Sequence, residues 1–479
     1  MIIKKQFQKV WYIGERLFYY FESYYSTLGW ISSDYPTGII EFAQKNYTAF
    51  YIDEADISMQ KRVWRRAFRN PKWLENKEKS FNNLRRRLVR ILKSLNVAGL
   101  SNKDLFIVYS EIINFYFLYQ GEYNIIARLL DRYGIEILRK KLEAVGIKNK
   151  DRENVITILT APQKESYLAR EERKFWQGIL GLHSPNKINS FFGQHLQQFA
   201  YVGRSYFDSH PLTKKHLEKR LVSYPKNEWP KKSLESPVSI EKNISQRKKL
   251  LANKKISHQI KKSATVLQKA THLKDSIRGC LAEVYHHSNP VFKELAKRTG
   301  LRVWQLKSLN IEEVETIFLK NEKADKNILK KRFFGTYLVL PVGKAVKVLY
   351  GKKALTFKKK YLERTYEEDK LELEGRPVSS GKVTGLVRVV HNLEEAKSLK
   401  TGEILVVSNT NPAFIPYLKG VSAIIAEEGG VTVHAAIVSR ELRIPCIIGI
   451  NSARKLFRTG DRIEVDANQG IVRKLKQKA

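Results

Sequence analysis

The hydrophobic pattern of the chain changes once, near residue 370. Before that point, apolar side chains recur at the three- and four-residue spacing of an amphipathic helix, as in Leu84, Leu88, Ile91 and Leu92. After it, short apolar runs alternate with Gly, Asn and Asp, which is typical of strands and tight turns. We therefore predict a multidomain fold, with a mostly α-helical N-terminal and middle region followed by a C-terminal α/β domain.

Residues 1–222 are rich in aromatic and basic side chains. The segments Trp11–Ile13 and Leu17–Phe21 place bulky groups on nearly every side, which predicts a helix buried on several faces. Basic and apolar residues interleave in Lys61–Arg69 and Leu84–Leu92. Such mixtures can bind nucleic acid, but a helix with an apolar core face and a basic rim is the more common arrangement. We expect a basic helical region here.

The middle of the chain divides into two parts. Residues 223–262 are enriched in Lys, Ser, Pro and Asn, which predicts a lysine-rich linker or exposed loop. Residues 263–365 return to a helical pattern, with Asn310 as a helix cap and Glu313 reaching back to it. Two short strands are expected at the end of this part, at 337–341 and 346–351.

Residues 371–479 read as a compact α/β domain. Six apolar runs are expected to be strands, at 385–390, 402–407, 423–426, 446–449, 462–466 and 470–472. Helices fit between several of them, at 393–399, 414–419 and 435–442.

The chain is strongly basic, and most of the excess charge lies in its first 370 residues. The 479 residues carry a formal net charge of +39. Residues 371–479 hold 16 Lys and Arg against 11 Asp and Glu, which leaves 71 against 37 in the first 370 residues. Such an excess attracts polyanions or acidic proteins, and it is equally the mark of a generally lysine-rich proteome.

Cysteine content and hydropathy indicate a cytoplasmic protein. Cys280 and Cys446 are far apart in sequence and form neither a disulfide framework nor a metal-ligand cluster. No apolar run reaches the roughly 18 residues of a membrane helix, and the N-terminus lacks the apolar segment of a signal peptide. We expect no metal site and no membrane contact.

The stretch 428–442 carries the candidate chemistry. Gly429 and Gly430 allow a tight turn and close approach of a ligand. Thr432 and His434 follow, just before a run of helix formers that begins at Ala435. A histidine at the first turn of a helix lies where free N–H groups and the helix dipole favour an anion. A neutral imidazole is a competent nucleophile, so a phosphoryl group is the expected anion.

A series of motifs occurs in order in the C-terminal domain: Gly385–Val389, Gly402–Val406, Thr410–Pro412 with Pro416, Gly429–Ile437, Arg440–Pro445, Gly460–Asp461, Val465–Asp466 and Gly470–Val472. With these motifs the domain resembles the mobile, swivelling phosphohistidine domain of phosphoenolpyruvate-utilising enzymes, a family that includes phosphoenolpyruvate synthase, pyruvate phosphate dikinase and rifampin phosphotransferase. Through Leu159–Pro162, Arg278 and Ile311–Val314, residues 150–365 resemble, more weakly, the helical region that precedes this domain in synthase-like and rifampin phosphotransferase-like proteins.

The resemblance implies that His434 is phosphorylated in transit between two active sites. Thr432 would then orient the ring or the phosphoryl group through its hydroxyl. Gly429 and Gly430, with the backbone N–H of Ala435, would hold the phosphoryl oxygens. Arg440 and Glu441 would be supporting residues on the same helix, structural more than chemical.

The chain also departs from the family. Val433, Ala413 and Leu418 stand where the family often has serine, aspartate and methionine, and we expect these positions to lie on loops that could dock a partner. The first 370 residues show no glycine-rich phosphate loop and no ATP-grasp pattern. We also expect no TIM barrel after the histidine domain. Mg²⁺ and ATP or phosphoenolpyruvate are therefore expected through a partner, such as a separate ATP-grasp or other nucleotide-binding protein.

The sequence thus favours a phosphotransferase that carries a phosphoryl group on His434 to an unknown small-molecule acceptor and is incomplete without a partner domain. Two alternatives stay open. One is a non-catalytic binding or regulatory protein that retains the phosphohistidine fold. The other, less favoured because no nucleic-acid-binding motif is present, is a basic nucleic-acid-binding protein.

Overall fold

The structure is a computed structural model. It describes residues 7–13, 38–43, 47–53, 57–128, 133–204, 211–306, 309–334, 337–342, 345–361, 372–391, 393–408, 410, 414, 417–418, 420–427, 434–450 and 453–475. The α-helices among them are α2 (Ile57–Arg69), α3 (Lys72–Ser94), α4 (Asn102–Arg128), α5 (Ile135–Ala144), α6 (Asn149–Thr160), α7 (Tyr167–Ile179), α8 (Pro185–Phe199), α9 (Lys214–Val222), α10 (Trp229–Ala252), α11 (His258–Thr299), α12 (Val303–Leu306), α13 (Ile311–Leu319), α14 (Lys326–Phe334), α15 (Gly351–Tyr361), α16 (Leu393–Ala396), α17 (His434–Glu441) and α18 (Ala453–Leu456). Short 3-10 helices are η1 (Val97–Gly99), η3 (Ala200–Arg204) and η4 (Lys226–Glu228).

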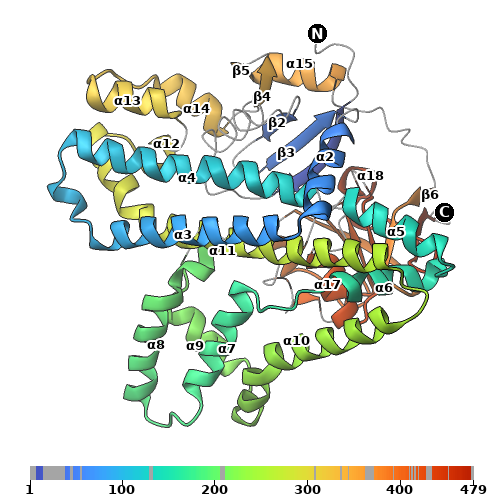
Figure 1. The fold of residues 1–479 in the computed structure, drawn as a ribbon. Coiled ribbons are helices and arrows are strands. Elements are labelled where there is room, and N and C mark those ends of the chain that lie inside the picture. The colour runs from blue at the N-terminus through green and yellow to red at the C-terminus, as the bar shows by residue number, and fades with distance from the viewer. Residues whose placement is uncertain are drawn as a thin grey trace.

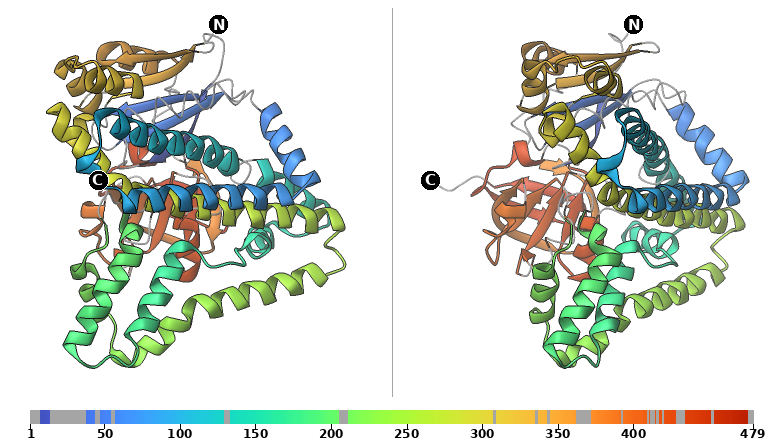
Figure 2. Two further views of the ribbon diagram at one scale, coloured as in Figure 1. Left: turned by 60° about the vertical axis from the view of Figure 1, so that its left-hand side comes forward. Right: turned by 90° about the vertical axis from the view of Figure 1, so that its left-hand side faces the viewer.

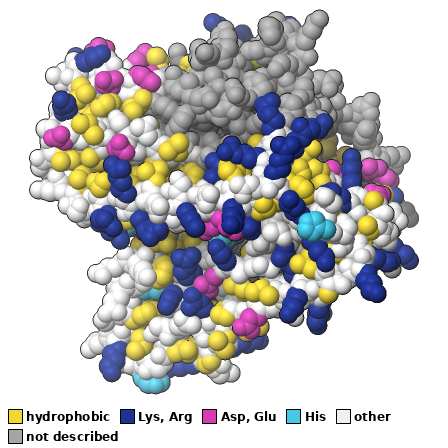
Figure 3. Space-filling view, viewed as in Figure 1, with side chains coloured by type: hydrophobic (Ala, Val, Ile, Leu, Met, Phe, Trp, Pro, Cys, Tyr) yellow, Lys and Arg dark blue, Asp and Glu magenta, His cyan; other side chains and the backbone are white. Residues whose placement is uncertain are grey.

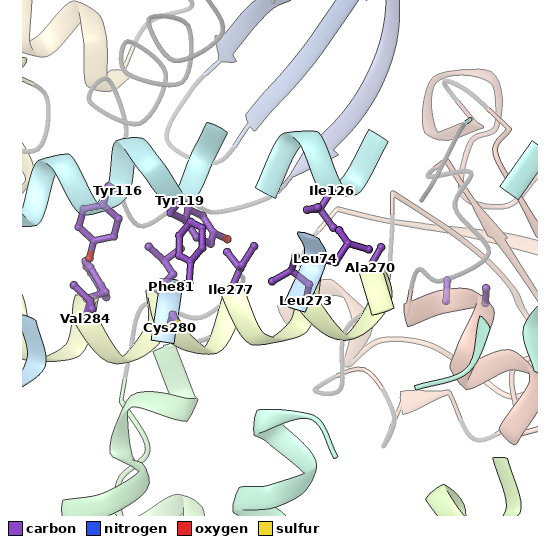
Figure 4. Close-up of a cluster of buried hydrophobic side chains, with 14 of the residues drawn as sticks. Leu74, Phe81, Tyr116, Tyr119, Ile126, Ala270, Leu273, Ile277, Cys280 and Val284 are labelled. Atoms are coloured by element: carbon purple, nitrogen blue, oxygen red, sulfur yellow. The ribbon is translucent and has the colours of Figure 1, made fainter. Parts of the chain in front are cut away.

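Helix α11 is the central element of the helical body. It runs for 42 residues, from a Ser257 side chain that accepts the N–H of Ile260 to a left-handed Gly300. Helices α3 and α4 lie along it, and α5, α6 and α7 also pack against it (Figure 1). Phe81 of α3, Tyr119 of α4 and Ile277 of α11 belong to the core between these helices (Figure 4). The predicted helical character of this part is confirmed.

The apolar face predicted for α3 is mostly correct. Leu88 and Leu92 are buried and Leu84 is half-buried, but Ile91 is 38% exposed. The predicted cap at Asn310 is present in full: its side chain accepts the N–H of Glu313, and the Glu313 carboxylate accepts the N–H of Asn310.

The N-terminal segment is a strand where we expected a buried helix. Strand β1 (Phe7–Ile13) includes the Trp11–Ile13 run, while Leu17–Phe21 lies outside the described residues. An antiparallel sheet of order β1-β3-β2-β4-β5 joins it to β3 (Tyr47–Asp53), β2 (Gly38–Ala43), β4 (Tyr337–Val342) and β5 (Ala345–Tyr350). The prediction failed because β-branched and aromatic residues also suit a strand, and the pairing partners lie far along the chain. Trp11 of β1 pairs with Phe50, and Ile40 of β2 pairs with Val339.

The predicted linker at 223–262 is also wrong, because most of it is helix. Helix α10 has Pro230 in its first turn, where the missing N–H has no cost. It packs against α6 and α7, with Trp229 and Arg247 buried. The guanidinium of Arg247 donates to the carbonyl oxygen of Leu159, at the end of α6, over 3.0 Å.

The C-terminal domain is built on an eight-stranded mixed sheet of order β6-β13-β12-β8-β9-β10-β11-β7. Its strands are β6 (Glu372–Glu374), β7 (Arg376–Ser379), β8 (Lys382–Val390), β9 (Ile404–Val407), β10 (Ala423–Ala426), β11 (Cys446–Ile448), β12 (Arg462–Asp466) and β13 (Ile471–Lys474). All six predicted strands are present, and β6 and β7 add to them. Of the predicted helices, 393–399 and 435–442 correspond to α16 and α17.

The two faces of the parallel part of the sheet pack against different layers. Ile404 and Val406 share a cluster with Ile463 and Val465 of β12, so the antiparallel strands cover this face. Leu405 and Val407 belong instead to the cluster that contains Ala435 and Ala436 of α17, and this cluster continues into α3, α4 and α11. The domain therefore has β, β and α layers, and its helical side adjoins the helical body (Figure 2).

Candidate functional site

The candidate site lies at one edge of the C-terminal sheet. Strands β8, β9, β10 and β11 are parallel neighbours, so their carboxyl ends meet at the same edge. In open α/β sheets, ligands bind outside the carboxyl ends of the strands. A ligand-binding site is therefore expected at this edge of the sheet.

Helix α17 brings His434 to this edge. The helix connects β10 to its parallel neighbour β11 and packs against both. A crossover helix runs back along the sheet, so the N-terminus of α17 lies where β10 ends. His434 is the first residue of α17, as predicted, while its side chain lies outside what the structure describes.

The other predicted site residues are placed only in part. Ala435 is fully buried beside β11, which leaves its backbone as the group that could face a ligand. Arg440 and Glu441 form the end of α17, and their side chains are not described. Gly429, Gly430 and Thr432 lie outside the described residues, as do Val433 and Ala413. Leu418, which we expected on a docking loop, is instead buried in the core.

An ion pair that the sequence analysis missed lies at the same edge. The guanidinium of Arg454, at the start of α18, donates to the Glu427 carboxylate over 2.9 and 3.1 Å, and the backbone N–H of Arg454 donates to the other oxygen over 3.1 Å. Both side chains are 7% exposed. Glu427 directly follows β10 and precedes the segment that leads to His434. A carboxylate directly after a buried strand was the available sequence indication.

A second ion pair involves the amino end of β9, at the opposite edge of the sheet. The Arg388 guanidinium in β8 donates to the carboxylate of Glu403, which precedes β9. Nε lies 3.1 Å from both carboxylate oxygens, and Nη2 lies 2.5 Å from Oε1. Burial acts to raise the pKa of Glu403, but hydrogen bonds from Arg388 and the N–H of Lys400 outweigh it and lower the pKa below its usual value. Asp466 closes β12 as predicted, accepting the N–H groups of Asn468 and Gln469.

The described residues do not fit a resident divalent metal ion. They contain no group of three or more His, Cys, Asp or Glu side chains placed to hold one. Mg²⁺ is therefore assigned no ligands in the described part of this chain. Both cysteines are buried free thiols. Within the described residues, no helix is both long enough and apolar enough to span a bilayer.

Helices α2 and α3 carry a dense part of the excess positive charge. Residues 57–93 contain 13 Lys and Arg against two acids, and both acids are paired, Glu75 with Lys269 and Glu78 with His272. Lys and Arg gather over these helices in the space-filling view (Figure 3). Nine exposed cations lack a carboxylate partner among the described residues: Lys61, Arg62, Arg65, Arg69, Lys72, Lys79, Arg87, Arg90 and Lys93.

Comparison with known proteins identifies the C-terminal domain. Residues 399–470 match the family described as "PEP-utilising enzyme, mobile domain". The phosphoenolpyruvate synthase of Aeropyrum pernix is 41% identical over 111 residues, which are 23% of this chain and 14% of that protein. The probable phosphoenolpyruvate synthase of Pyrococcus horikoshii is 45% identical over 108 residues, 22% of this chain and 13% of that protein.

The match thus covers about a seventh of the length of these curated relatives. Among solved structures, Thermococcus kodakaraensis aconitase X (holo-form) aligns with 22% of this chain and 98% of that chain. Its sequence identity of 22% and TM-score of 0.18 are too low to support a conclusion. The chain carries a mobile domain of the phosphoenolpyruvate-utilising type, as its motifs predicted.

Proposed function

We propose that this protein is a phosphotransferase that carries a phosphoryl group on His434, from a donor site on a separate protein to a small-molecule acceptor. The observation that carries the proposal is the match of residues 399–470 to the mobile domain family, with His434 as the first residue of a helix at the carboxyl edge of the sheet. That position lies at the positive end of the α17 dipole, which favours a phosphoryl group.

The chemistry is two displacements at phosphorus. In the first, the unprotonated ring nitrogen of His434 attacks, the N–P bond forms, and the bond from phosphorus to the donor oxygen breaks with its electron pair leaving on that oxygen. In the second, an acceptor oxygen attacks phosphorus, the O–P bond forms, and the N–P bond breaks with its electron pair returning to the ring nitrogen, which takes the proton if the acceptor is a hydroxyl group. Thr432, Gly429 and Gly430 would orient and hold the phosphoryl oxygens, and the N–H of Ala435 would donate to them.

In this proposal, the residues that bind the phosphoryl donor and Mg²⁺ lie on a partner protein. Phosphoryl transfer depends on positioning and on charge neutralisation, commonly by Mg²⁺. The described residues lack a metal cluster, and the match covers only a small part of the curated relatives. A separate nucleotide-binding protein of the ATP-grasp type would supply ATP or phosphoenolpyruvate together with Mg²⁺. Arg440 and Glu441 would support α17 without touching the phosphoryl group.

Transfer of label to His434 tests the proposal. The full chain is incubated with lysate of its host and with ³²P-labelled ATP or phosphoenolpyruvate, and acid-labile, base-stable label on the chain is measured. We expect label on the wild type and on His183→Ala, an exposed histidine in the helical body, and none on His434→Ala.

Equal label on the wild type and on both variants would contradict the proposal. No label on any of them, across both donors, would favour the alternative that the domain keeps its fold as a non-catalytic binding or regulatory module. Acid lability separates phosphohistidine from phosphoserine or phosphothreonine.

A further inference from the structure

Three side chains form a row along the carboxyl edge of the sheet. Val390 of β8, Val407 of β9 and Ala426 of β10 are in register. The residues that follow them are His391, Ser408 and Glu427, one from each strand. The strand ladder continues into the row, because the N–H of Glu427 donates to the carbonyl oxygen of Val407 over 3.0 Å.

Arg454 spans this row. Its guanidinium binds the Glu427 carboxylate on one side through Nε and Nη2. On the other side, Nη1 lies 3.2 Å from Nδ1 of His391. One cation therefore joins residues that follow β8 and β10, with Ser408 between them in the register. The charges of Arg454 and Glu427 balance each other, so the pair can be buried.

The row presents hydrogen-bond donors for a ligand. A guanidinium can only donate, so Nδ1 of His391 accepts, and the ring hydrogen is on Nε2 of an exposed side chain. Ser408 is 7% exposed, and its hydroxyl is buried without a hydrogen-bond partner. An unpaired buried hydroxyl lowers stability, and such groups are retained where function needs them.

We propose that His391, Ser408 and Arg454 form a phosphoryl-binding subsite, in which the Ser408 hydroxyl and the His391 Nε2–H donate to phosphoryl oxygens and Glu427 holds the Arg454 guanidinium in place. The subsite lies at the same carboxyl edge as the start of α17, but on the side of α18, whose Ala453 packs on the sheet face opposite to the one that Ala435 of α17 covers. It deepens the proposed function on which it rests. Glu427 is thus a positioning residue, whereas Ser408 and His391 touch the ligand.

The domain contains a matched control for this pair. Arg388 and Glu403 also form a hydrogen-bonded ion pair between neighbouring strands, with side chains 24% and 12% exposed. Glu403 precedes β9, at the amino end of that strand, and the Arg388 side chain reaches it from a position three residues before His391. Arg388→Lys should alter domain stability, because a forked ion pair is lost, but it should leave phosphate binding at the subsite unchanged.

The first measurement uses inorganic phosphate as the probe. Thermal unfolding of the full chain is followed at rising phosphate concentration, with chloride added to constant ionic strength. We expect phosphate to raise the unfolding midpoint of the wild type and of Arg388→Lys, and to have little of this effect on Ser408→Ala and Arg454→Lys. Without phosphate, Ser408→Ala should unfold at the same temperature as the wild type or higher, because it removes an unpaired buried hydroxyl.

The second measurement uses phosphorylated His434. Loss of a hydrogen bond to a charged oxygen should change the rate of label transfer about 10-fold to 100-fold in Ser408→Ala, and less than twofold in Arg388→Lys. If phosphate stabilises Ser408→Ala as much as the wild type, the subsite is wrong, even when His434 takes up label. If phosphate binding depends on Ser408 but no variant takes up label, the result supports the subsite and contradicts the carrier function.

Discussion

Gly279 of α11 and Tyr167 of α7 meet where the two helices cross, and the glycine leaves no spare room. A Cβ atom at position 279 would lie 3.0 Å from Cγ and 3.1 Å from Cβ of Tyr167. Tyr167 is fixed at the start of α7, because its N–H donates to the Asp275 carboxylate of α11 over 3.1 Å. The absence of a side chain at 279 thus sets how closely α7 approaches the central helix.

Gly279→Ala should therefore destabilise the protein although alanine is the better helix former. The gain in helix propensity is about 1 kcal/mol, and overpacking against an anchored ring costs about 1–3 kcal/mol. Gly193→Ala is the control, since Gly193 is exposed within α8 and no atom lies within 4 Å of its would-be Cβ. We expect chemical unfolding to show opposite signs for the two variants. A stabilising Gly279→Ala would contradict the close contact.

The Glu171 carboxylate should depend on Arg220. Glu171 is 2% exposed, with Nη1 of Arg220 at 2.8 Å and Nε2 of His195 at 2.7 Å. Burial acts to raise the pKa of Glu171, but the hydrogen bonds from His195 and Arg220 and the Arg220 charge lower it below its usual value. Arg220→Met leaves the buried carboxylate without its cation and should cost about 3 kcal/mol.

The comparison for that variant is Lys214→Met. Lys214 pairs with Glu218 across 3.6 Å on the exposed side of α9, and such pairs contribute less than about 0.5 kcal/mol. Guanidinium chloride unfolding at pH 7 measures the loss of stability in both variants. Equal, small losses would mean that the Glu171 carboxylate finds another partner once Arg220 is gone.

His287 should make the helical body sensitive to acid. Burial and the neighbouring Lys93 ammonium lower the pKa of His287 from 6.5 to about 4. Between these values the unfolded chain binds a proton that the native state does not, so stability falls as pH drops from about 6.5 towards 4. His287→Gln removes this contribution to the pH dependence of stability. Its unfolding midpoint should vary less with pH across that window than the midpoint of His258→Gln, an exposed control.

Salt should stabilise the protein through α2 and α3. The exposed cations there repel one another, because no described carboxylate pairs with them. Raising NaCl from about 0.1 M to about 1 M shortens the Debye length from about 10 Å to about 3 Å and screens this repulsion. We expect a higher unfolding temperature in salt, with a smaller gain in the triple variant Arg62→Gln, Arg65→Gln, Arg69→Gln. An unchanged salt response in that variant would place the repulsion elsewhere.

The C-terminal domain was predictable because its determinants are local. Each short apolar run is bounded by Gly, Asn or Asp, and a buried strand is largely fixed by a run of that kind. The start of α17 at His434 also follows from neighbouring residues, since helix formers begin immediately after it. The Asn310 cap follows from Glu313 three residues later.

The errors in the helical region have a common physical cause. A lysine-rich stretch such as 229–252 forms a helix because α6 and α7 bury one side of it, and the buried Arg247 is satisfied by a carbonyl that its own helix does not provide. Likewise, Trp11–Ile13 forms a strand because β3 supplies the hydrogen bonds.

The sequence by itself determined the C-terminal domain, its strands and the place of His434 at a helix start, since these depend on residues within one or two turns of each other. Only the tertiary structure decided which polar groups share the site. His391, Ser408, Glu427 and Arg454 are separated by up to 63 residues, and strand register together with one guanidinium brings them into a single row. No local pattern encodes such a register, because it depends on how separate strands align.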